Sequence, residues 1–335
     1  MLFRSRVVQA IMAAALCAAL TIVPVHAAAM RTWTVLTGGD VKGSAVVSNS
    51  FRPRTIEISV GDTVTWRLRA TWTIHTVTFL SGAKPPEPFL REGDKTYHNP
   101  EIFFPVGGKT YDGTGVRNSG VPPDPMKAFS YSLTFTKAGT FNYLCLLHGP
   151  AMGGTVVVKT RAMGSPASVS ARGQREFAAT LRAGQKAFAG LKPQMSAKTV
   201  TLPMVGDAKG GWSILRFSHG PLTIKAGTTV TWVVRDPLEI HTVTFTGGEK
   251  PPDFVVVEAQ AQGPPKLLFP AKIAAQTSLK AHPGKGWVNS GILFPPGEPG
   301  NPPTSFSLTF NTPGRYEYIC LVHVPWGMKS AIIVK

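Results

Sequence analysis

An internal repeat is the feature of this 335-residue sequence that most constrains its fold. Short identical segments recur in the same order in the two halves of the chain: IHTVTF at 74–79 and 240–245, NSG at 118–120 and 289–291, and SLTF at 132–135 and 307–310. An unchanged order of identical segments indicates a tandem duplication. A chain of this length also has room for two domains of about 100–200 residues each.

The repeat sets the domain boundaries that we predict. One domain is expected at 30–159 and the other at 198–335, joined by a linker at 160–197. Within the linker, apolar side chains at Phe177 and Phe188, with Leu181 between them, have helical spacing and predict a short helix.

Each copy also contains a long segment rich in proline and glycine, at 81–127 and 247–303. Connections of this length are usually functional or mobile. We expect these two inserts to affect docking or contacts between domains rather than the site itself.

Short runs in each copy alternate apolar with polar side chains. In the run 55–60, Ile56, Ile58 and Val60 fall on one face, and the polar residues between them fall on the other. Such runs, bounded by glycine and proline, are typical of antiparallel strands. Since the copies show almost no helical periodicity, the sequence predicts an all-β chain with one β-sandwich in each copy.

The first 29 residues have the pattern of a secretory signal peptide. Arg4 and Arg6 precede an apolar run at 7–23, and cleavage is expected near Ala27–Ala29. The mature protein is therefore expected in the periplasm or outside the cell. Cys17 lies within the apolar run and would be removed with it.

Composition narrows the class of partner. The formal net charge is +17, which favours either solubility in an acidic or saline setting or attraction to an acidic redox partner or an anionic cell surface. An exported chain with no basic run and no recognisable binding motif is not expected to bind nucleic acid. After the leader, no apolar run reaches the length of about 18 residues that predicts a membrane span.

Each copy places a cysteine, a histidine and a methionine close together in sequence: Cys145, His148 and Met152 in the first copy, and Cys320, His323 and Met328 in the second. These soft donors suit copper. The repeated IHTVTF segment adds His75 in one copy and His241 in the other. Two imidazoles and a thiolate with a weak axial methionine describe a blue copper site. Because each cysteine has its own histidine and methionine, no disulfide is expected between them.

In the order and type of these histidine, cysteine and methionine residues, each copy resembles a cupredoxin of the plastocyanin, pseudoazurin and amicyanin type. The resemblance covers nearly all of the chain outside the leader and the linker. It implies two tandem Greek-key β-sandwich domains, one type 1 copper in each, and one-electron transfer between Cu(I) and Cu(II). It also implies that apolar residues around each loop histidine leave that histidine's edge exposed to a redox partner protein. The sequence departs from the family at Thr76 and Thr242, where an asparagine is common, and a threonine hydroxyl is a candidate substitute.

Two other functions remain open on the sequence. The ligand set also suits copper storage or delivery. A copper oxidoreductase enzyme is disfavoured, because its catalytic copper needs further histidines, whereas the chain has no His-x-His pair and the residues before its cysteines are Leu144 and Ile319. Zinc is disfavoured because methionine is a poor zinc ligand. His98, His219 and His282 have no counterpart in the other copy and are expected to be loop histidines.

Overall fold

The computed structural model describes residues 30–69, 73–124, 126–217 and 220–335. Arg31–Lys335 forms one compact unit. The predicted signal peptide, with Cys17, and His219 lie outside the described residues. Most of the regular structure is β-strand, so the prediction of an all-β fold is confirmed. Among the described helices, none has both the length and the apolar character needed to cross a membrane.

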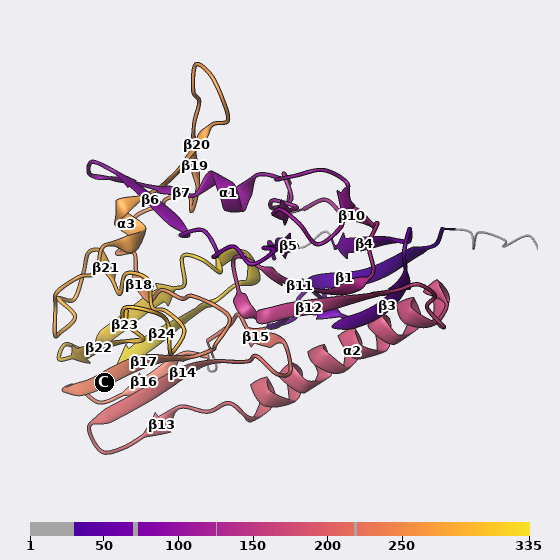
Figure 1. Ribbon diagram of the computed structural model, residues 1–335. Coiled ribbons are helices and arrows are strands. Elements are labelled where there is room, and N and C mark those ends of the chain that lie inside the picture. Colours follow the sequence, from indigo (N-terminus) through magenta and orange to yellow (C-terminus); the bar gives the residue numbers. More distant parts are fainter. Residues whose placement is uncertain (1–29, 70–72, 125, 218–219) are drawn as a thin grey trace, which may run out of the picture. The chain divides into compact units, whose positions relative to one another are not determined.

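The first repeat forms two sheets that pack around one core (Figure 1). One sheet contains β1 (Thr32–Asp40), β2 (Val46–Arg52), β4 (Thr63–Leu68), β10 (Phe129–Phe135) and β8 (Thr110–Tyr111). The other contains β3 (Thr55–Ser59), β12 (Gly149–Lys159), β11 (Gly139–Cys145), β5 (Thr78–Phe79) and β9 (Arg117–Asn118). Trp66 is fully buried between them, with its ring centroid 5.2 Å from that of Tyr143.

The second repeat forms an equivalent pair of sheets. One contains β15 (Trp212–Ile214), β14 (Thr199–Asp207), β17 (Thr228–Arg235) and β22 (Ser305–Phe310), and the short β13 (Gln194–Met195) pairs with β14. The other contains β16 (Leu222–Ile224), β24 (Lys329–Val334), β23 (Gly314–Ile319), β18 (Thr244–Phe245) and β21 (Val288–Asn289). Trp232 takes the place of Trp66, again fully buried, at 5.2 Å from the ring of Tyr318.

Most of the described strand pairs are antiparallel, as predicted, but several are parallel. β1 pairs with β4 in parallel, and β14 pairs with β17 in the same way. Between β1 and β4 the chain passes through β3 in the opposite sheet. It then returns to the first sheet, where β4 runs in the same direction as β1. The run predicted at 55–60 is β3 itself, which pairs in parallel with β12.

The two repeats share one sheet, which the sequence repeat does not predict. β15 pairs with β2, with Ser213 opposite Val47, so the sheet continues from the first repeat into the second. The linker helix α2 (Pro166–Gly190) covers this junction, and its Phe177 and Leu181 pack in one buried cluster with residues of β2 and β15 (Figure 1). The helix is 25 residues long and begins earlier than its apolar spacing predicts, because Ser165 caps its first turn.

The proline- and glycine-rich inserts also join the repeats, as expected for segments that affect domain contacts. They build a four-stranded sheet from β6 (Phe89–Glu92), β7 (Lys95–His98), β20 (Lys266–Phe269) and β19 (Val256–Glu258). Two short helices, α1 (Pro100–Phe103) and α3 (Ala271–Ala274), follow the strands. His98 is therefore not a loop histidine: it ends β7 and is buried against aromatic rings, among them Phe103 and Phe254.

Candidate metal centres

The NSG segment of each repeat anchors the residues that directly follow the upstream histidine, at the start of β5 and of β18. Ser119 accepts a hydrogen bond from the backbone amide of Val77 at 2.9 Å, and Thr78 donates to Asn118 at 2.9 Å. Gly120 has φ +63, and a Cβ there would lie 2.7 Å from the carbonyl oxygen of Phe103, so the turn requires glycine. The second repeat makes the same contacts through Asn289, Ser290 and Gly291.

The threonine after each upstream histidine connects the two ligand-bearing segments. The Oγ1 atom of Thr76 accepts from the backbone amide of Leu146 at 2.8 Å, and the backbone amide of Thr76 points at the Cys145 sulfur at 3.4 Å. In the second repeat, Thr242 accepts from Leu321, also at 2.8 Å. The threonine hydroxyl thus connects the two ligand-bearing segments, at the position where the resemblance implies an asparagine.

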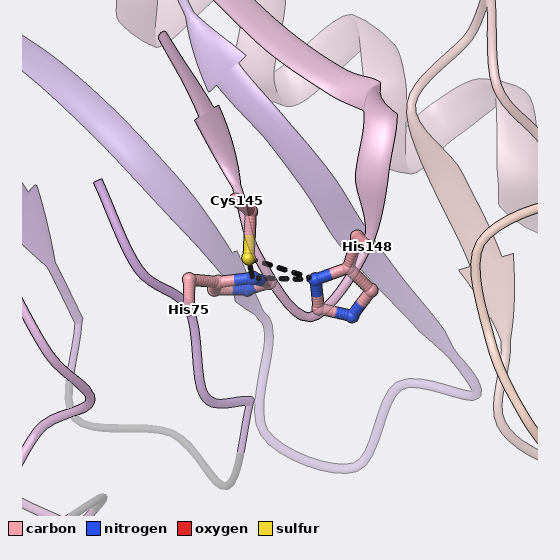
Figure 2. Close-up of side chains that lie close together, drawn as sticks. All are labelled: His75, Cys145 and His148. Atoms are coloured by element: carbon pink, nitrogen blue, oxygen red, sulfur yellow. Dashed lines mark hydrogen bonds between the residues drawn. The ribbon is translucent and has the colours of Figure 1, made fainter. Parts of the chain in front are cut away.

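Three donor atoms converge in the first repeat (Figure 2). The Cys145 sulfur lies 3.2 Å from Nδ1 of His148 and 4.0 Å from Nδ1 of His75, and the two Nδ1 atoms are 3.3 Å apart. The centre of a triangle with these edges lies about 2 Å from each corner, which is the length of a metal–imidazole bond. The donor triangle therefore fits a single metal ion.

The second repeat brings the matching residues together. His241, Cys320 and His323 offer donor atoms within 4.8 Å of one another, and the Cys320 sulfur lies 3.5 Å from Nδ1 of His323. His241 is fully buried, and neither of its ring nitrogens has a hydrogen-bond partner in the described part of the chain, although Nε2 lies 4.0 Å from a carboxylate oxygen of Asp236. A buried polar atom without a partner is costly, so this histidine fits a metal ligand better than a core residue.

The two predicted axial methionines lie in the right core clusters. Met152 is 1% exposed and shares a buried cluster with Cys145, and Met328 is fully buried in the cluster of Cys320. The backbone amide of Cys320 donates to the carbonyl of Met328 at 2.9 Å. Their role as thioether ligands stays a prediction.

Each cluster favours a thiolate. Burial raises the pKa of the Cys145 thiol, but His148 and His75 lower it by more, so that the pKa falls well below its usual range. Burial lowers the pKa of His148, yet the Cys145 thiolate and Glu239 raise it to about 10. Cys320 and His323 form the same kind of pair. Without metal, the charged donors of each cluster hold one another in place; with metal, the thiolate is ready to bind.

Glu239 is the residue at this site that the sequence analysis missed. Its Oε1 atom lies 3.3 Å from Nε2 of His148, and its Oε2 atom lies 3.4 Å from Nε2 of His323. One carboxyl group therefore contacts the loop histidine of both clusters. Burial raises the pKa of Glu239, but His148 and His323 outweigh burial and hold that pKa well below its usual range. In the sequence, Glu239 is marked only by a difference between the two copies, since the position that matches it in the first copy is occupied by Thr73.

The position of Glu239 overturns one implication of the resemblance. The edges of the loop histidines are not exposed: the side chains of His148 and His323 are 8% and 4% accessible. The reason is that the ligand loops of the two repeats face each other across a shared junction. Trp326 of the second loop donates from its indole to Asp40 of the first repeat at 2.9 Å, and it packs on the ring of His323.

The fold and the two clusters define an all-β protein of two-sheet sandwiches with two candidate metal centres, each built from two histidines and one cysteine. Solved structures similar to the chain include variants of amicyanin. A reduced tryptophan-to-tyrosine variant is 16% identical, and the match covers 43% of this chain and 92% of that chain with a TM-score of 0.24. A reduced proline-to-phenylalanine variant is 26% identical over 38% of this chain and 82% of that chain, with a TM-score of 0.20. No protein-family model and no curated protein matches the chain.

Proposed function

We propose that this protein is an exported electron carrier that holds one type 1 copper ion in each His–Cys–His cluster. The observation that carries the proposal is the convergence of two imidazoles and one thiolate at matching positions of both repeats, with a buried methionine in the same core. When bound, copper supplies a one-electron couple between Cu(I) and Cu(II). The ligands of the first centre would be His75, Cys145, His148 and Met152, and those of the second His241, Cys320, His323 and Met328.

The surroundings of the ligands suit electron transfer. His75 and Cys145 are at most 1% exposed, and the Thr76 hydroxyl ties their two segments together. Ligands held in this way keep the same positions in both oxidation states, which keeps the reorganisation small. Copper storage or delivery needs ligands that release the metal readily, so the buried and tied donors favour the carrier over the handling protein.

An enzyme is the less favoured alternative. In the part of the chain that the structure describes, the groups of His, Cys, Asp and Glu side chains able to hold a metal are the two clusters. His98 and His282 pack instead among aromatic rings. A second type of copper centre would need histidines beyond these, so we propose a carrier without catalytic copper. Its partner would be an acidic redox protein, which the positive net charge would attract.

Two single substitutions test the assignment of the clusters. Cys145→Ser should remove the thiolate of the first centre only, and Cys320→Ser that of the second. Each variant is expected to bind copper in blue form at the remaining centre and to lose about half of the visible thiolate-to-copper absorption. If either variant lost all blue copper, the assignment of one independent centre to each repeat would be wrong.

A further inference from the structure

Each loop histidine has its two ring nitrogens in different environments. In His148, Nδ1 faces its own cluster, at 3.2 Å from the Cys145 sulfur, while Nε2 faces Glu239. In His323, Nδ1 likewise faces Cys320, and Nε2 faces the other oxygen of the same carboxyl group. A path of two imidazole rings and one carboxyl group therefore leads from one cluster to the other.

The carboxyl group of Glu239 is held in place by both repeats. Asn49, on β2 of the first repeat, donates from its amide to Oε1 of Glu239 at 2.7 Å and to Ser213 at 3.1 Å. Ser213, on β15, donates in turn to Asp236 at 3.1 Å. The shared β2–β15 sheet thus positions Glu239, and the group is itself only 9% exposed. In such a buried setting, a fixed charge acts more strongly than it would in water.

We propose that Glu239 joins the two centres into one electron-exchanging pair, through contacts with Nε2 of His148 and Nε2 of His323. This inference rests on the proposed function, since it needs copper in both clusters. One electron leaves the reduced centre, which becomes oxidised, and enters the oxidised centre, which becomes reduced. No bond breaks and no proton moves. An electron that enters at either centre can then be passed to the other.

The same contacts have a second consequence. Glu239 places one negative charge beside both centres, and a negative charge favours the oxidised, more positive form of each. Removing that charge raises the reduction potential of both centres together. A residue that only filled space at the junction would not change two potentials in the same direction.

The test uses the full copper-loaded chain in a Met328→Gln background. The new axial ligand gives the second centre a spectrum and a potential different from those of the first. A flash that delivers fewer than one electron per chain should be followed by redistribution between the two bands, at a rate independent of protein concentration. Glu239→Leu removes the bridging oxygens, so this rate is expected to fall below that of the parent protein.

Glu239→Gln keeps the size of the side chain and removes its charge. It also tests the bridge if the Glu239→Leu variant does not fold. We expect it to raise the potentials of both centres, measured by spectroelectrochemistry, and to slow the redistribution. Glu258→Gln is the matched control, because Glu258 contacts Lys95 and Tyr97 across the inserts, outside either cluster. It should change neither quantity.

Three results would overturn the bridge: no concentration-independent redistribution, an unchanged rate in both Glu239 variants, or a shift in the potential of one centre only. Failure of the proposed function is a separate result. It would be seen before any flash experiment, as a chain that binds no copper or gives no blue band.

Discussion

The Oγ1 atom of Thr76 accepts a hydrogen bond from the backbone amide of Leu146 at 2.8 Å, and it joins the histidine-bearing segment to the loop that begins at Cys145. The pair Thr242 and Leu321 repeats this bond at the same length in the second sandwich. Because the two segments are far apart in sequence, the geometry of each cluster depends on this bond between them.

Thr76→Val should therefore disturb the first centre and leave the second intact. Valine keeps the shape of threonine but leaves the amide of Leu146 without its acceptor, which costs about 1–3 kcal/mol of unfolding free energy. Denaturant unfolding measures the loss, and a change confined to one part of the visible copper spectrum locates it. Thr76→Ser keeps the hydroxyl and should restore the spectrum. An unchanged spectrum in the valine variant would mean that the bond does not hold the ligands.

Gly120 ends the NSG segment, whose Asn118 and Ser119 form hydrogen bonds with the residues that follow His75. With φ +63 and a backbone oxygen 2.7 Å from the place of a Cβ, Gly120→Ala combines a left-handed backbone with a clash. We expect a loss of more than about 2 kcal/mol in unfolding free energy. Gly43→Ala is the control, since Gly43 has φ +81 but no atom within 4 Å of its Cβ position, and it should cost about 1 kcal/mol. Equal losses in the two variants would contradict the close approach.

His98 should make the stability of the protein depend on pH. Burial lowers its pKa from 6.5 to about 4. Between these values the unfolded chain binds more protons than the folded chain, so the stability that is present above pH 6.5 is lost as the pH falls towards 4. From pH 7.5 to pH 5, the contribution of His98 should fall by about 2 kcal/mol.

His98→Phe provides the measurement, because phenylalanine suits the aromatic surroundings and does not titrate. When the pH is lowered from 7.5 to 5, the unfolding free energy of the wild type should fall by about 2 kcal/mol more than that of the His98→Phe variant. If both proteins lost the same unfolding free energy on acidification, His98 would not be the group that makes the stability depend on pH.

The grouping of two histidines and one cysteine in each repeat could be predicted from the sequence, but the contact of Glu239 with both groups could not. His75 and His241 occupy identical segments, so the repetition itself indicates their shared role. Glu239 has no such signal beyond the break of symmetry with Thr73, because its importance depends on how the two sandwiches pack. The local alternation also does not predict the pairing of β2 with β15, which needs partners from different repeats.

Within each sandwich, the alternation of apolar residues predicted strands but not their direction. Ile56 and Ile58 of β3 are buried as expected, but Val60, predicted on the same face, follows the end of the strand and is 42% exposed. Its parallel partner β12 follows from the path of the chain between the sheets, which no local pattern records. The linker helix was found through Phe177 and Leu181, while its earlier start depends on the cap at Ser165.

The copper content of the purified protein, together with its visible spectrum in the oxidised and reduced states, tests most directly whether both clusters bind redox-active copper. We expect two copper ions per chain and an intense thiolate-to-Cu(II) band that bleaches on reduction and returns on reoxidation. Metal that is colourless, or a band that does not cycle, would contradict the electron carrier and favour copper storage or delivery.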